Sequence, residues 1–217
     1  MSRDGYEVTL GGLAIHMVQL TVAELMVANG AGGAADGADA TFAAKLAALR
    51  MSVRRVGDDA VTFTSLQGRA WDARFNIGQT IGLMSVFDQI HGATADEVAE
   101  VANAAVVTEG ADGTTTAVKI GDKVVVLGVL PAARFQATLA TAGKQTSALS
   151  RQYMTILDGV RRSIVTLDGA APEWAGDWVA TWPFTPKQTA ILGSIWQDLH
   201  GLTEPDAARP TLVASTK

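Results

Sequence analysis

Apolar and polar positions along the chain recur in blocks, and the clearest block occurs once in each half of the sequence. Residues 79–94 read QTIGLMSVFDQIHGAT and residues 188–203 read QTAILGSIWQDLHGLT, with seven of sixteen positions identical at a shift of 109. Ordinary residue frequencies would give roughly one identity. Apolar residues at i, i+3, i+4 and i+7 predict an amphipathic helix in both copies. These positions are Leu83, Val86, Phe87 and Ile90, matched by Leu192, Ile195, Trp196 and Leu199.

Two further blocks recur upstream in the same order. Residues 8–20 align without a gap on residues 118–130 at a shift of 110, and each block has two β-prone runs around a two-residue turn. The turns are Gly11-Gly12 and Gly121-Asp122, so each block predicts a β-hairpin. The third block has apolar spacings of 3, 4 and 3 in both halves, at a shift of 111, and predicts another amphipathic helix. Its positions are Leu46, Leu49, Val53 and Val56, matched by Leu157, Val160, Ile164 and Leu167.

This order predicts an α+β protein built from two tandem repeats, each a β-hairpin plus about three helices, related by a pseudo-two-fold axis. The first unit is expected over residues 1–105 and the second over residues 106–217. Residues 108–116 (TEGADGTTT) are expected to be a turn-rich connector. Residues 30–40 (GAGGAADGADA) are typical of a mobile linker, or of a segment that only a partner orders.

The helices predicted within residues 79–94 and 188–203, called the closing helices below, carry matching signals at their N-terminal ends. Asn76 and Thr185 each precede a glutamine by three residues, Gln79 and Gln188, which predicts a capping box. Thr94-x-x-Glu97 and residues 203–206 predict caps for whatever follows.

The same helices end in the pair His-Gly, where a glycine in the left-handed conformation would close the helix and His91 or His200 would face the negative end of its dipole. This structural interpretation is favoured over a role at an interface or with an ion. His16 is expected on the hairpin surface.

The two copies differ most in their tryptophans. The second has Trp174, Trp178 and Trp182 at intervals of four, and the first has Trp71 alone. Helical spacing would place the three rings along one face. They are expected either to plug the core of the second unit or to anchor a partner, since tryptophan is enriched at binding hot spots. Our candidate partner interface is therefore Trp71, Trp174, Trp178 and Trp182.

Composition narrows the possible chemistry. The chain has 217 residues, 48% of them hydrophobic and only 18% charged, so it has ample material for a core and little charge to cover a surface. Part of that surface is therefore expected to meet a partner. A net charge of -5 and the absence of cysteine argue against nucleic-acid binding, disulfides and thiolate metal sites. Five arginines are interpreted as a solvated helix face: Arg50, Arg54, Arg55, Arg161 and Arg162.

No catalytic, cofactor-binding or metal-binding motif occurs, and the acidic pair Asp58-Asp59 is interpreted as helix-end punctuation. We therefore expect no catalytic residue, no cofactor and no metal site. The longest apolar run, residues 124–133, is too short to cross a bilayer, and residues 1–10 lack the apolar core of a signal peptide. The chain is expected to be soluble, with neither a membrane nor a small molecule as its partner.

The repeated unit resembles small assembly proteins of tailed bacteriophages, namely tail assembly chaperones and baseplate hub assembly proteins. Three features carry the resemblance: a hairpin that runs into an L-T-x-x-E helix start (residues 20–24), a helix followed by a Gly-Asp-Asp or Leu-Asp-Gly turn, and a closing amphipathic helix. The turns are residues 57–59 and 167–169. Members of these families usually have one such unit, whereas this chain has two.

The resemblance implies a non-enzymatic structural or assembly protein of a phage tail or baseplate. It would act through protein–protein contacts with other tail or baseplate proteins, either in the virion or in the host cytoplasm during assembly. Two alternatives remain at this stage. One is a bacterial adaptor or binding module without catalytic activity, and the other is an enzyme without a recognisable motif.

Overall fold

The computed structural model describes residues 5–31, 38–110 and 113–202. This part of the chain is mixed α+β and contains two four-stranded antiparallel sheets, each with its strands in sequence order. The first sheet consists of β1 (Gly5–Leu10), β2 (Leu13–Val18), β3 (Val53–Val56) and β4 (Asp59–Ala60). The second consists of β5 (Val106–Gly110), β6 (Gly113–Ile120), β7 (Lys123–Gly128) and β8 (Ile164–Leu167).

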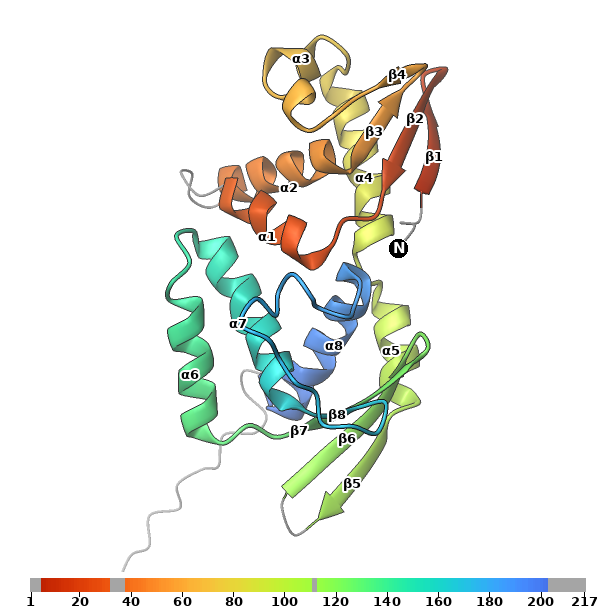
Figure 1. Cartoon of the computed structure of the whole chain (residues 1–217). Coiled ribbons are helices and arrows are strands. Elements are labelled where there is room, and N and C mark those ends of the chain that lie inside the picture. The colour runs from red at the N-terminus through yellow and green to blue at the C-terminus, as the bar shows by residue number, and fades with distance from the viewer. Residues whose placement is uncertain (1–4, 32–37, 111–112, 203–217) are drawn as a thin grey trace, which may run out of the picture.

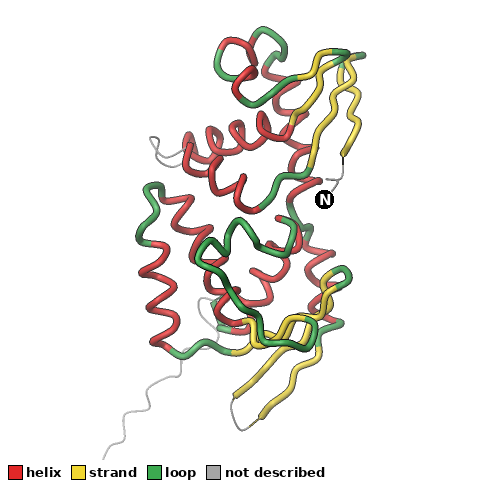
Figure 2. Tube along the Cα trace, in the orientation of Figure 1, coloured by secondary structure: helices red, strands yellow, loops and turns green. Residues whose placement is uncertain are grey.

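Helices pack against each sheet, and the two halves are stacked one on the other (Figure 1). The helices of the first half are α1 (Val22–Ala31), α2 (Ala38–Ser52), α3 (Arg69–Asp72) and α4 (Ile77–His91), with a 3-10 turn at Thr64–Leu66. Those that follow are α5 (Ala95–Asn103), α6 (Ala132–Ala142), α7 (Ala148–Ser163) and α8 (Pro186–Leu199). A long irregular segment separates β8 from α8, as Figure 2 shows in green.

Both predicted hairpins are confirmed. β1 pairs with β2 from Gly5–Val18 to Leu10–Leu13, and β6 pairs with β7 as far as Ile120–Lys123. Gly11, Gly12 and Gly121 have φ of 60°, 80° and 62°, a left-handed conformation that glycine adopts without a side-chain clash. The glycines thus set where each hairpin turns.

The helices predicted from the apolar spacing over residues 46–56 and 157–167 are wrong in their last four residues. α2 ends at Ser52 and α7 at Ser163, and the residues that follow form β3 and β8. Arg54 is an extra residue in β3, because Met17 pairs with Val53 and the next β2 residue, His16, pairs with Arg55. This bulge lets Val53 and Val56 both face the core, although they are three residues apart. A bulged strand therefore has the apolar spacing of a helical turn.

The predicted connector is also wrong. Residues 106–110 and 113–120 are β5 and β6, which pair from Val106–Ala117 to Gly110–Gly113. Valine and threonine favour strands, and here they outweigh the turn signals of the glycines. Residues 30–40, predicted to be a linker, lie largely outside the described residues, since α1 continues to Ala31 and α2 begins at Ala38.

Among the described residues, the helix caps follow the sequence pattern with one exception, and the cap predicted at residues 203–206 lies outside them. Asn76 with Gln79 and Thr185 with Gln188 form complete capping boxes, and Thr94 with Glu97 forms a third at α5. Gly201 has φ of 64°, as predicted, but Gly92 has φ of -86°. The left-handed prediction is wrong at Gly92, because there the chain leaves in an extended conformation and leads directly into α5.

Each half has its own hydrophobic core. The first gathers around Leu49, Leu83 and Trp71, and the second around Leu157, Leu192 and Trp196. The link helix α5, which the predicted boundary at residues 105/106 assigns to the first unit, packs instead with the second core through Val98, Val101 and Ala102. The connection between the halves is thus part of the second core.

Candidate interaction surface

The two repeated histidines hold equivalent positions. His91, at the end of α4, accepts a hydrogen bond at Nε2 from the backbone N–H of Leu20 (2.8 Å) and donates from Nδ1 to the carbonyl of Phe87 (3.0 Å). His200 repeats both bonds, with Leu130 N–H at 2.8 Å and the Trp196 carbonyl at 2.7 Å. Each ring ties a closing helix to the second residue before the first helix of its own half.

Both rings face carbonyls of the last helical turn, as predicted, but they do so as hydrogen-bond donors rather than as cations. Nε2 accepts a hydrogen bond in both rings, so each imidazole is neutral in this arrangement. Burial lowers the pKa of His91, although the carbonyl of Phe87 and the carboxylates of Asp88 and Glu24 act in the opposite direction. The pair therefore has a structural role in this arrangement. The sequence contained a signal for the hydrogen bonds from Leu20 and Leu130, because these two residues are aligned in the repeat just as the histidines are.

Trp71 and Trp182 also occupy matching positions. The indole N–H of Trp71 donates to Thr80 Oγ1 (2.9 Å), and that of Trp182 donates to Thr189 Oγ1 (2.8 Å). Their rings are only 2% and 9% exposed, so each is a core residue that orients the start of a closing helix. To anchor a partner, either ring would have to leave its core.

The other two tryptophans lie against Trp182 and keep part of their surface. Trp174 stacks on Trp182 with ring centroids 5.4 Å apart, and Trp178 meets its edge at 5.7 Å. The segment forms turns rather than the helix that their spacing suggests, yet it brings all three rings together. Both outer rings are half-buried and pack on the second core. They therefore remain available for the predicted partner contact, which stays a prediction.

Two of the five arginines surround a buried acid that the sequence pattern did not single out. Asp158 is 0% exposed and accepts from Arg161 at 2.6 Å and from Arg162 at 2.7 Å. The guanidinium of Arg161 also lies 4.7 Å from the ring centroid of Trp178. The interpretation of these arginines as a solvated helix face is thus wrong for Arg161 and Arg162.

The remaining arginines also differ from that interpretation. Arg54 and Arg55 lie on β3 rather than on a helix, and Arg55 pairs with Glu7 at 2.7 Å. Arg50 lies over the ring of Trp71, 5.6 Å from its centroid, and burial lowers its pKa. His16 is half-buried on the hairpin and contacts Glu7 at 2.9 Å, in keeping with its predicted place. Asp59 pairs with Arg74 beside a strand turn, so the acidic pair does not mark a helix end.

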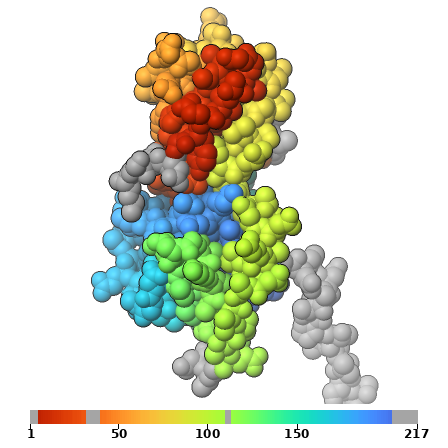
Figure 3. Space-filling view, turned by 90° about the vertical axis from the view of Figure 1, so that its right-hand side faces the viewer, coloured from red at the N-terminus to blue at the C-terminus, as the bar shows by residue number. Residues whose placement is uncertain are grey.

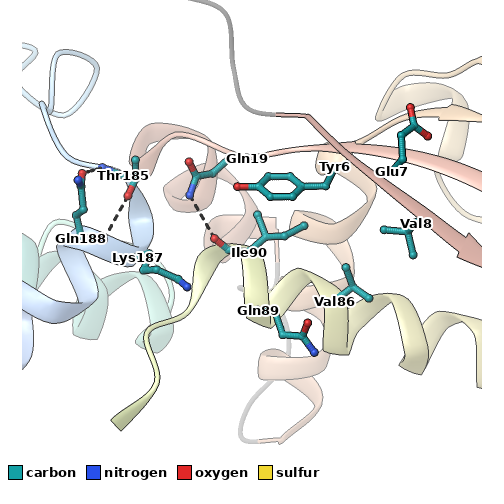
Figure 4. Close-up of a pocket in the computed structure, with 10 residues that line it drawn as sticks. All are labelled: Tyr6, Glu7, Val8, Gln19, Val86, Gln89, Ile90, Thr185, Lys187 and Gln188. Carbon is teal, nitrogen blue, oxygen red and sulfur yellow. Dashed lines mark hydrogen bonds between the residues drawn. The ribbon is translucent and has the colours of Figure 1, made fainter. Parts of the chain in front are cut away.

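A cleft of about 550 Å³ lies between the two halves. One wall is β1, the second is the last part of α4, and the third is the first turn of α8 (Figure 4). Its lining is mostly uncharged, with Tyr6, Val86 and Ile90 among the larger side chains. Gln19, the residue after β2, donates from Nε2 to the carbonyl of Ile90 at 3.2 Å and so joins the end of the hairpin to the end of α4 beside the cleft.

The two charged side chains at this cleft already have partners. Glu7 pairs with Arg55 and His16, and Lys187 donates to Glu97 Oε1 at 2.9 Å. The hydrogen bond from Lys187, followed by that from the Thr94 N–H, lowers the pKa of Glu97 to about 2. The cleft offers apolar surface and amide groups, which suit a polypeptide better than a charged small molecule.

A second depression, of about 540 Å³, lies beside Trp174. Arg134, Arg161 and Arg162 line it together with Pro172. Arg161 and Arg162 share the single carboxylate of Asp158, so the depression keeps an excess of positive charge. It adds a polar rim to the partly exposed tryptophans.

Within the described ranges, no group of three or more histidine, aspartate or glutamate side chains is arranged to hold a metal ion. In the same ranges no helix has the length and apolar character that a membrane span requires. In comparisons with known proteins, no family model, curated protein or solved structure matches the chain significantly.

Proposed function

We propose that the chain is a non-enzymatic structural or assembly protein of a bacteriophage tail or baseplate and that it works through protein–protein contacts. The observation that carries the proposal is a pair of halves with the same internal bonds and different outer surfaces. A second copy with altered surfaces gives one chain two different neighbours, which is a requirement of a component set between unlike parts. The resemblance to phage assembly proteins supplies the choice of system.

We interpret the halves as two copies of one unit. The bonds from His91 and His200, those from Trp71 and Trp182, and the capping boxes of α4 and α8 recur at aligned positions. These bonds tie together parts of the chain about 70 residues apart in the case of the histidines. Recurrence of long-range contacts supports duplication more strongly than recurrence of helix periodicity does.

The contacts between the halves favour a head-to-tail order over the predicted pseudo-two-fold axis. A two-fold axis brings equivalent elements together in reciprocal pairs. Here α1 contacts α7, and Asn29 accepts from Ser147 Oγ at 3.2 Å across this contact. The cleft likewise joins the C-terminal end of α4 to the N-terminal end of α8. Such contacts use different faces of the two units, as successive members of a stack do.

The experiment is purification of the tagged chain from cells that produce the phage encoding it, followed by identification of bound proteins. We expect tail or baseplate proteins to co-purify with the wild-type chain. Trp174→Ala and Trp178→Ala should reduce this association while Tm changes by only about 2 °C, because both rings are half-buried.

Leu139→Ala is the matched control, since Leu139 is 48% exposed on α6 and lies outside both clefts. It should leave the association unchanged. Recovery of the wild-type chain without any tail or baseplate protein would contradict the proposal. Loss of association only in proportion to lost stability would leave Trp174 and Trp178 with a core role alone.

A further inference from the structure

In the second half, the groove between β6 and α8 is filled by the link that follows α4. β5 pairs with the outer edge of β6, and α5 packs along α8 and β6. The apolar side chains of this link join the second core; they are Val98, Val101, Ala102 and Ala105. The acidic start of α5 is fixed to α8 by the Glu97–Lys187 bond.

In the first half, the equivalent groove is open. Residues 6–8 of β1 align with residues 116–118 of β6, and Val86 and Ile90 align with Ile195 and Leu199. In the first half these residues line the 550 Å³ cleft, although Ile90 is also a buried member of the first core. Among the described residues, no strand pairs with the outer edge of β1. Figure 3 shows β1 (red) and α4 (yellow) side by side on one face, with α5 (yellow-green) lower down against the second sheet.

The chain contains a second segment that begins with the same pattern as the filler of this groove. The filler runs for 17 residues, from Thr94 to Gly110, and begins two residues after His91-Gly92. Residues 203–217 follow His200-Gly201 at the same offset, and this segment is 15 residues long. It repeats the threonine with an acidic residue three positions later and ends in TLVASTK, a β-prone run after a proline.

The one filler that the structure describes passes forward, from the end of α4 into the groove of the second unit. α4 ends beside the N-terminal turn of α8, so α5 enters the second unit at once. The end of α8 lies about 21 Å from the open groove, because the 14 residues of α8 separate them. A next unit in the same forward direction would belong to another molecule.

We propose that residues 203–217 of one copy dock in the groove between β1 and α4 of a second copy, with a strand added to β1. Repetition of this step would join the chains head to tail into a ring or an open filament, according to whether the rotation closes. The edge of β1 supplies backbone hydrogen bonds, and the cleft accepts apolar side chains of the added segment. This inference rests on the duplicated unit of the proposed function and gives that function its first partner, a second copy.

The test compares the purified full chain with a chain truncated after residue 202. Sedimentation velocity should give the full chain a mass above that of a monomer that rises with concentration, and the truncated chain the mass of a monomer. A fluorescent peptide of residues 201–217 should bind the truncated chain in an anisotropy titration. The same peptide with Val213→Pro should bind at least about tenfold more weakly, since proline cannot continue a ladder of strand hydrogen bonds.

Two substitutions on one helix localise the binding. Val86→Lys places a charge in the groove and should weaken peptide binding by at least about tenfold. Ile81→Lys, at a position of α4 that is 57% exposed and outside this cleft, should leave binding within about twofold. The peptide variant keeps the test decisive if Val86→Lys fails to fold.

A monomeric full chain overturns the proposal, including the case in which the peptide binds, because the roughly 50 Å reach of 15 extended residues would then serve the molecule's own groove. Assembly of the truncated chain equal to that of the full chain overturns it as well. Self-assembly without co-purifying tail proteins contradicts only the proposed function, and co-purification of a monomeric chain contradicts only this inference.

Discussion

In the second half of the molecule a strand and a helix from the link cover the sheet edge and the closing helix, whereas in the first half the same two surfaces border an open cleft. In the second half, β5 covers the edge of β6 and α5 covers α8, so a strand and a helix are the elements that such surfaces accommodate. An edge strand with unpaired backbone groups favours addition of another strand, and proteins usually cover or blunt such edges. In our proposal the first half is therefore the receiving end, and the link is the pattern for its ligand.

The tryptophans show a second difference between the halves. Trp71 and Trp182 each donate an indole hydrogen bond to a threonine of a closing helix. Only Trp182 also has two tryptophan rings packed on it, those of Trp174 and Trp178. The second half thus has an added aromatic surface, and the first half has an unfilled groove. Each unit differs from the other in the feature through which it would meet a neighbour.

The largest expected effect tests whether both halves use the same core. Trp71→Ala and Trp182→Ala should each lower the free energy of unfolding by roughly 3–5 kcal/mol, because each removes a buried ring and leaves a cavity. Urea denaturation of both variants measures this. A large loss for Trp71→Ala with almost none for Trp182→Ala would show that Trp174 and Trp178 replace the missing ring and that the halves do not share one core arrangement.

The next effect separates the two histidines by burial. His91→Phe leaves the Leu20 N–H without its acceptor in a buried site, and should lower the free energy of unfolding by about 1–3 kcal/mol. His200→Phe should lower it less, because the Leu130 bond is only partly buried and water can replace the ring nitrogen. Thermal and urea denaturation of the pair check this order. If neither substitution lowered the free energy of unfolding measurably, the two histidine hydrogen bonds would not stabilise the fold as we propose.

The pH dependence of stability follows from His91. Burial lowers its pKa below the ordinary value of 6.5, so the unfolded chain binds the proton more readily than the folded one. Stability from this group is complete above pH 6.5 and declines as the pH falls from 6.5 through the lowered pKa. Urea denaturation between pH 7.5 and the acid limit of folding should show the decline, and His91→Phe should reduce it. An unchanged slope in that variant would assign the dependence to other groups.

The smallest effect concerns the bond that holds the link in the second groove. Glu97 has a pKa lowered to about 2 by Lys187 and the Thr94 N–H, so its contribution is present above the ordinary pKa of 4.5 and is lost as the pH falls towards 2. Because the pair is exposed to solvent, Glu97→Gln should lower Tm only slightly, and less at high salt. A drop as large as that of His91→Phe would mean that docking of α5 depends on this ion pair rather than on its apolar face.

Much of the local structure could be predicted from the repeated blocks, because hairpins and caps depend on nearby residues. Gly11-Gly12 and Gly121-Asp122 mark the turns, and the capping residues mark the helix starts. The strands β3 and β8 could not be separated from their helices, since a bulge at Arg54 gives a strand the apolar spacing of a helix. Strand β5 was missed because pairing with β6, a tertiary contact, decides its conformation.

The candidate surface was harder to predict than the fold. Tryptophan spacing grouped three rings that lie together in the structure. It could not show that Trp182 is a core residue and that only its two neighbours retain surface. The open cleft draws on three elements from both halves, and no short motif records such a site. One sequence signal does point to the cleft. The motif His-Gly-x-Thr recurs where the link begins and where residues 203–217 begin.

Hydrogen–deuterium exchange of the truncated chain tests most directly whether one groove is filled and the other open. With the peptide of residues 201–217 added, amides of β1 should exchange more slowly, while those of β6, already paired with β5, should exchange at an unchanged rate. Unchanged exchange at β1 under saturating peptide, or equal slowing at β1 and β6, would contradict the account.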